Sequence, residues 1–139
     1  MIKKIFIGIS AVLHIVVFVL FSKNLIKMNI LYLLAFCYAP IIISLLLCAI
    51  DTYINKTNHS IIYSVINILY LIVANKFVAN SEALDTIYKN SQKYSSTNVN
   101  VSLDSSPILS LILLCVISTV LHIGLVKFMN KKMTSKIPF

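Results

Sequence analysis

The sequence predicts an all-α, multi-pass membrane protein with four transmembrane helices in a single membrane domain, residues 1–139. Apolar residues make up 59% of the chain and charged residues only 12%. Soluble domains are roughly 45–50% apolar and about 25% charged. At about 1.5 Å of rise per residue, about 20 apolar residues in a helix cross a hydrocarbon core roughly 30 Å thick. Four runs have that length: residues 5–22, 28–50, 60–79 and 107–126.

The second run, residues 28–50, carries no charge, and Pro40 lies at its midpoint. A proline inside a helix frees the carbonyl four residues earlier, here that of Phe36. In a membrane bundle a neighbouring polar side chain or water can pair with that carbonyl. One face of this helix carries a thin polar stripe, formed by Cys37, Ser44 and Cys48. We therefore expect the proline to be tolerated and the stripe to face protein.

The third and fourth runs also predict inward-facing sides. Small and polar residues, which membrane helices use against each other, share one face of the third run: Ser64, Asn67, Leu71 and Ala74. The fourth run begins at Pro107, a favourable first helical residue, and its polar side comprises Cys115, Ser118, Thr119 and His122. The first two runs are joined only by residues 23–27, so they are expected to form an antiparallel hairpin.

The long connection between the third and fourth runs, residues 80–106, is polar. Within it, residues 81–93 are expected to form an amphipathic helix, because Leu84, Ile87 and Tyr88 share a face. Residues 95–104 are expected to be flexible or loosely extended.

A basic tail, residues 127–139, follows the fourth run and contains Lys127, Lys131, Lys132 and Lys136. Lysines beside a span attract anionic lipid, so the tail is expected on the membrane surface. Two roles stay open for it: a stop-transfer and orientation signal, or a docking site for a cytoplasmic regulatory protein. The positive-inside rule, applied to all lysines, places both termini in the cytoplasm and the long loop outside, at the cell membrane.

Three polar positions within the spans are candidate functional residues: His14, Asn67 and His122. The tetrapeptide VLHI occurs at residues 12–15 and again at residues 120–123, which is too short to establish an inverted repeat. A metal or proton site built from both histidines with Cys37 and Cys115 is one interpretation. The other, which the sequence favours, is a neutral imidazole hydrogen-bonded to a neighbouring helix. We predict no metal and no cofactor.

Two further classes of protein are not expected. The chain has no GxSxG, HExxH, P-loop or dinucleotide motif, and its four acids, Asp51, Glu82, Asp85 and Asp104, fall outside the predicted spans, so no catalytic residue and no enzyme is predicted. Direct nucleic-acid binding is not expected either, because the net charge of +8 comes from lysines beside apolar runs.

Several features together resemble a known family. They are a lysine-bearing amino terminus, the sequence PIIIS at residues 40–44, NKT at residues 55–57, an Asn-containing third span, a long polar loop and a lysine-rich end. This pattern resembles Msa, the modulator of SarA, a family of small staphylococcal membrane proteins. The resemblance implies an accessory membrane protein that influences the transcriptional regulator SarA and, through it, virulence-factor expression. It implies no catalytic residues. The alternative is a small transport or bacteriocin-immunity-type membrane protein.

Overall fold

The computed structural model describes residues 4–24, 27–80, 82–95 and 107–134. Within those residues all regular structure is helical, which confirms the all-α prediction. Five α-helices and one short 3-10 helix are present: α1 (Ile5–Lys23), α2 (Ile30–Asn55), α3 (Ser60–Asn80), α4 (Ala83–Ser91), the 3-10 helix Gln92–Tyr94, and α5 (Pro107–Thr134).

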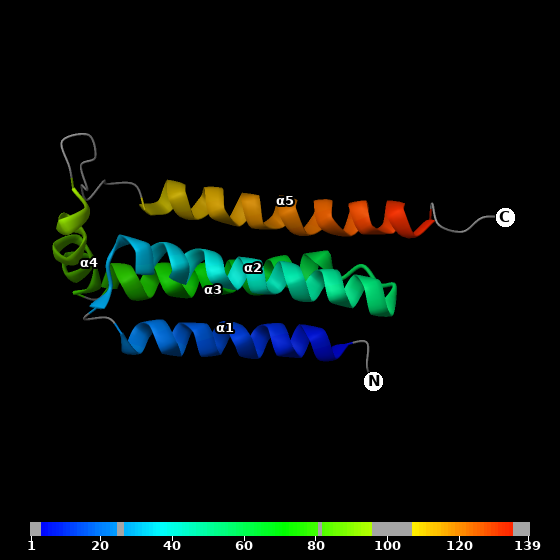
Figure 1. Cartoon of the computed structure of the whole chain (residues 1–139), viewed down its shortest axis with the longest axis horizontal. Coiled ribbons are helices and arrows are strands. Elements are labelled where there is room, and N and C mark those ends of the chain that lie inside the picture. The colour runs from blue at the N-terminus through cyan, green and yellow to red at the C-terminus, as the bar shows by residue number, and fades with distance from the viewer. Residues whose placement is uncertain (1–3, 25–26, 81, 96–106, 135–139) are drawn as a thin grey trace.

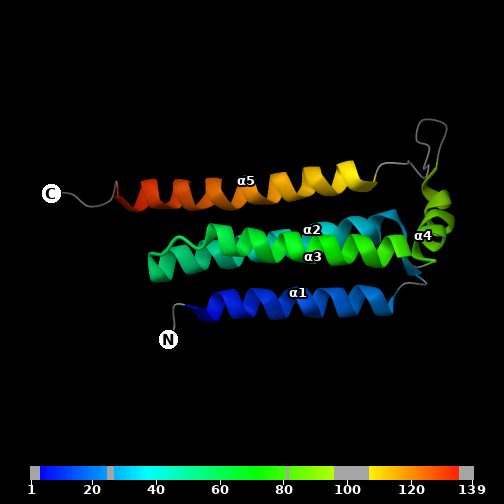
Figure 2. The ribbon, with the colours of Figure 1, turned by 180° about the vertical axis from the view of Figure 1, so that it is seen from behind.

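The four long helices run side by side and alternate in direction, with α2 and α3 in the middle and α1 and α5 on opposite sides of that pair (Figure 1). The view from behind shows the same order (Figure 2). Helix α1 begins and α5 ends at one end of the bundle, hereafter the termini end, and α4 covers the other, hereafter the α4 end. Because the directions alternate, the connection between α2 and α3 also lies at the termini end.

Four helices are long and apolar enough to cross a membrane: Ile5–Lys23, Ile30–Asn55, Ser60–Ala79 and Ile108–Lys132. Their outward faces are apolar, as the 64% exposure of Ile15 and the 70% exposure of Ile61 illustrate. A soluble bundle would bury such side chains, whereas a membrane protein turns them toward lipid. The chain is accordingly a multi-pass membrane protein.

Helices α2 and α5 extend beyond their predicted spans at the termini end. Helix α2 continues to Asn55, where Lys56 ends it in the left-handed conformation with φ 54°. Asp51, expected outside the spans, therefore lies on α2 and is 1% exposed. The expectation was wrong because the end of the second span was placed before its first charged residue. A helix can continue past a charged residue whose side chain finds hydrogen-bond donors.

The structure pairs the carbonyl that Pro40 frees. The Tyr70 hydroxyl on α3 donates to the Phe36 carbonyl at 2.8 Å, and both residues are buried. The proline thus stays inside an unbroken α2, and the predicted pairing by a neighbouring polar side chain is confirmed.

Helix α4 lies within the predicted segment 81–93 and packs over the start of α2 (Figure 1). Its buried residues are Ala83, Ile87 and Ser91, whereas Leu84 is 38% exposed. The packed face is therefore rotated from the predicted one, because α4 docks through small and polar side chains as well as Ile87. The expected flexible segment lies mostly outside the described residues.

The interior differs between the two ends. Between the centre and the α4 end it holds an aromatic cluster, in which Phe36 stacks on Phe21 with ring centroids 5.4 Å apart and Phe18 meets Phe77 edge-on at 5.4 Å. Between the centre and the termini end α2 and α3 bury polar side chains instead: Asp51, Thr52, Ser60 and Ser64. The two halves of the bundle meet at the predicted polar positions.

Candidate functional site: a polar network through four helices

His14 lies near the middle of α1 and is only 4% exposed. Its Nδ1 donates to the Ser10 carbonyl at 2.7 Å, one turn earlier on the same helix. Its Nε2 lies 2.7 Å from Oδ1 of Asn67 on α3. The bond to the carbonyl fixes the ring, so that Nε2 points at the neighbouring helix.

His122 on α5 repeats this arrangement. Its Nδ1 donates to the Ser118 carbonyl at 2.7 Å, and its Nε2 lies 2.9 Å from the Ser44 hydroxyl on α2. The ring is fully buried. Each histidine is thus held by its own helix and reaches one helix of the central pair.

A hydrogen bond between α2 and α3 joins the two halves. The Asn67 amide donates from Nδ2 to the Ser44 hydroxyl at 2.5 Å, and both side chains are fully buried. His14, Asn67, Ser44 and His122 therefore form one continuous chain of hydrogen bonds, hereafter the central network, with one member from each membrane-spanning helix. The predicted positions His14, Asn67 and His122 are all brought together, although the two imidazoles do not touch.

No protein-family model matches this chain, and no match was found among curated proteins or solved structures. What the protein does is therefore inferred from its own residues and their geometry.

The sequences around the two histidines correspond over a longer stretch than the tetrapeptide VLHI. Residues 9–15 read ISAVLHI and residues 117–123 read ISTVLHI, which differ at one position. Both serine hydroxyls, on Ser10 and Ser118, are buried, and neither has a hydrogen-bond partner within the described part of the chain. A duplicated hairpin would relate α1 to α3, whereas this likeness relates α1 to α5. It is a local symmetry of the site, distinct from the inverted repeats of transporters.

Two tyrosines of α3 pack on the imidazoles. Tyr70 meets His14 edge-on with ring centroids 5.4 Å apart, and Tyr63 stacks on His122 at 6.3 Å with 6° between the ring planes. These contacts restrict the rotation of both rings.

A second polar cluster surrounds the Asp51 carboxylate at the termini end. It accepts hydrogen bonds from Asn55 Nδ2 at 2.6 Å, from His59 Nδ1 at 2.9 Å and from the Tyr63 hydroxyl at 3.2 Å. Sequence reasoning missed this cluster because it assigned Asp51 to a loop. The i, i+4 spacing of Asp51 and Asn55 could have indicated the first of these bonds, had α2 been extended, whereas His59 and Tyr63 lie beyond the end of α2.

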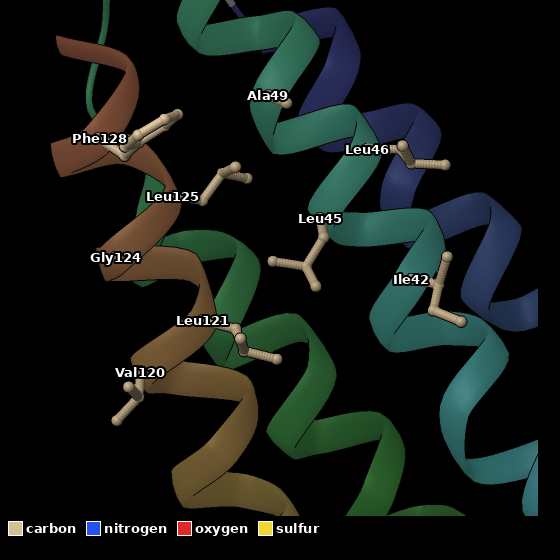
Figure 3. A pocket seen from close by; sticks show the side chains of 9 residues that line it. All are labelled: Ile42, Leu45, Leu46, Ala49, Val120, Leu121, Gly124, Leu125 and Phe128. Atoms are coloured by element: carbon tan, nitrogen blue, oxygen red, sulfur yellow. The ribbon is translucent and has the colours of Figure 1, made fainter. Parts of the chain in front are cut away.

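An apolar groove of about 680 Å³ lies between α2 and α5 on the outside of the bundle. Leu45 and Leu125 project into the space between the two helices, and small residues, Ala49 and Gly124, widen it (Figure 3). All nine lining residues are apolar. The groove suits hydrocarbon, and no polar chemistry is available there.

The cysteines that the sequence offered as metal ligands lie elsewhere. Cys37 and Cys115 pack against the hydrophobic core rather than joining the central network. Among the described residues, no three His, Cys, Asp or Glu side chains gather as a metal ion requires.

Three of the four candidate lysines of the basic tail lie on α5. Lys127, Lys131 and Lys132 are exposed, and the ammonium of Lys132 lies 4.7 Å from the centre of the Phe128 ring. Lys136 falls outside the described residues. The tail is thus helical as far as Thr134 and continues the direction of the last span (Figure 1).

Proposed function

We propose that this chain is a regulatory accessory protein of the bacterial cell membrane, which modulates the expression or function of the transcriptional regulator SarA and thereby virulence-factor expression. The observation that carries the proposal is the placement of exposed lysines on the last turns of α5, at the end of the bundle where α1 also begins. The pattern of residues that resembles the Msa family supports the same proposal.

The exposed lysines of α5 are suited to bind an anionic partner at a fixed distance from the central network. Lys127 and Lys131 are four residues apart and so lie on one side of α5, and an unbroken helix connects them to the central network. With the termini end in the cytoplasm, they face the anionic leaflet and any acidic surface of a cytoplasmic regulator. Each lysine contributes about 1 kcal/mol near such a leaflet, so a tighter protein partner can displace the lipid contact.

Transport is the second candidate, and the central network is the observation that favours it, because it places polar groups from four helices at the middle of the membrane. Against it, the aromatic cluster fills the interior on the α4 side. A polar solute would have to cross that cluster. The regulatory proposal needs no such path.

The test is deletion of the gene followed by transcript profiling, with complementation by three chains. The intact chain should restore the regulon. A chain with Lys131, Lys132 and Lys136 changed to Gln should insert normally but fail to restore it.

The matched control replaces the lysines nearer the α4 end, Lys76, Lys89 and Lys93, with Gln, which removes the same charge. It should restore the regulon. If the tail variant restores the regulon as well as the control does, docking through the tail is wrong. An unchanged regulon in the deletion strain would contradict the regulatory function itself.

A further inference from the structure

The pattern of hydrogen bonds in the central network determines how many protons its side chains must carry. In both histidines Nδ1 faces a backbone carbonyl, which can only accept, so Nδ1 must carry a hydrogen in each ring. Three contacts remain between side chains: His14 to Asn67, Asn67 to Ser44, and Ser44 to His122. Each of these contacts needs one hydrogen.

The network's neutral groups supply only two of the three. Asn67 places its carbonyl oxygen on one neighbour and its amide on the other, so it donates to one contact and accepts in the other. The Ser44 hydroxyl has a single hydrogen. With both imidazoles neutral, one contact is left with two acceptors facing each other at hydrogen-bond distance. That arrangement is unfavourable where no water competes.

One added proton satisfies all three of these side-chain contacts. When it resides on His14, the ring donates to the Asn67 oxygen, the Asn67 amide donates to Ser44, and the Ser44 hydroxyl donates to His122. When it resides on His122, that ring donates to Ser44, the hydroxyl donates to the Asn67 oxygen, and a reoriented amide donates to His14. A second added proton would require the Ser44 hydroxyl to turn to the Ile41 carbonyl, at 3.1 Å, and would place two positive charges in the membrane interior.

We propose that His14, Asn67, Ser44 and His122 form a binding site for a single proton, shared between the two imidazoles at the centre of the bundle. The two placements of the proton differ by reversal of all three hydrogen bonds. No atom has to leave its position beyond an amide turn and a hydroxyl rotation. The site is independent of the regulatory function proposed above.

Polar and titratable groups surround the central network. The carbonyls of Ser10 and Ser118 accept hydrogen bonds from the two rings. The titratable groups that face the network are Tyr70 beside His14 and Tyr63 beside His122, and Tyr63 donates to the Asp51 carboxylate. Cys48 packs with Tyr63, and His59 pairs with Asp51 at 2.9 Å. Asp51 and His59 lie toward the termini end.

The proton links the helices, and the sign of its effect follows. While the site holds its proton, the folded bundle binds one more proton than separate helices with neutral histidines, so the stability that this proton contributes is lost as the pH rises and the proton leaves. Loss of the proton breaks one of the three contacts and weakens the connection of α1 or α5 to the central pair.

The test counts protons on the histidine rings by nitrogen-15 NMR of the chain in lipid bilayers. The wild-type chain and His59→Asn, which leaves only the two network histidines, are titrated in parallel. The protonated fractions of His14 and His122 should sum to one over a plateau of about two pH units, because the pair holds a single proton as a unit. Two independent imidazoles would pass from a sum of two to nearly none over that interval, and this result, or a sum of zero throughout, would overturn the proposal.

Asn67→Asp gives a second, sharper count. A carboxylate at this position accepts from both neighbours, so His14 and the Ser44 hydroxyl both donate to it and His122 must donate to Ser44. The number of protonated imidazoles should rise from one to two, with no change in the net charge of the network. A sum that stays at one while the new carboxyl is ionised, as its carbon-13 shift reports, would contradict the assignment, and the wild-type titration tests it independently of whether this variant folds.

Discussion

At the scale of single residues, the Ser44 hydroxyl decides whether the polar groups act as one unit. It lies between the Asn67 amide, at 2.5 Å, and the His122 ring, at 2.9 Å. A hydroxyl both donates and accepts, and it rotates freely, so it can reverse its direction where a carbonyl or an ammonium cannot. Without it, the network would separate into a pair on α1 and α3 and an isolated histidine on α5.

Ser44→Ala should therefore destabilise the bundle by about 1–3 kcal/mol, because it leaves two buried partners unpaired. Ser118→Ala is the matched control: its hydroxyl is equally buried but has no hydrogen-bond partner among the described residues, so its loss should be nearly neutral or stabilising. Equilibrium unfolding in mixed micelles measures both. Equal effects of the two substitutions would contradict the central role of Ser44.

The sequence predicted three of the four network residues, and the reason the fourth was missed is physical. His14, Asn67 and His122 are energetically costly in a membrane interior, so each can be recognised from the sequence as a candidate functional residue. A serine costs little and is frequent wherever helices pack closely, so Ser44 was placed on an inward stripe without a partner. Which polar side chains meet depends on the rotation of each helix about its axis, and a run of apolar residues does not specify that rotation.

At the scale of the elements, Pro40 and Tyr70 couple α2 to α3. Tyr70→Phe should cost about 1 kcal/mol in the native chain, because the Phe36 carbonyl loses its only donor among the described contacts. In a Pro40→Ala background the new amide of residue 40 pairs with that carbonyl within α2, so the same change should cost much less. A double-mutant cycle in mixed micelles measures the difference. Equal costs in both backgrounds would show that the hydroxyl does not compensate for the proline.

Hydrogen bonds hold helix α4 against the start of α2, and one of them caps the first turn of α2. The Ser91 hydroxyl accepts from the Ile30 amide at 2.7 Å, and the Asn90 side chain donates to the Met28 carbonyl at 2.7 Å. The first amides of a helix lack partners within it, so Ser91 supplies one from α4.

Ser91→Ala should raise the hydrogen-exchange rate of the Ile30 amide by roughly tenfold, corresponding to about 1.4 kcal/mol of lost local stability. Lys89→Ala, a change at an exposed position of α4, should leave that rate unchanged. Exchange measured by mass spectrometry or NMR distinguishes the two. An Ile30 amide that is unaffected by Ser91→Ala would mean that α4 is held by its apolar contacts alone.

The existence of the helices was predictable from the sequence, and their ends were less so. Apolar runs located the four spans, and the spacing of Leu84 and Ile87 located α4. The extension of α2 to Asn55 depends on donors that Asp51 finds in Asn55, His59 and Tyr63, which belong partly to the next helix. Such tertiary compensation cannot be deduced from local hydropathy.

At the scale of the whole molecule, the bundle has two unlike halves. Aromatic side chains and α4 close one end, whereas buried polar groups, the Asp51 carboxylate and the exposed lysines of α5 occupy the other. The central network lies where the halves meet.

The central claim, that four helices cross the membrane with the termini end and the α4 end on opposite sides, is tested most directly by accessibility of single cysteines. In a chain with Cys37, Cys48 and Cys115 replaced by Ala, Lys93→Cys and Lys131→Cys place one thiol at each end, both at exposed positions. An impermeant reagent added outside intact cells should label the cysteine at position 93 and should reach position 131 only after the membrane is opened. Labelling of both cysteines from the same side would contradict the four-helix membrane bundle, and labelling of position 131 alone would reverse its orientation.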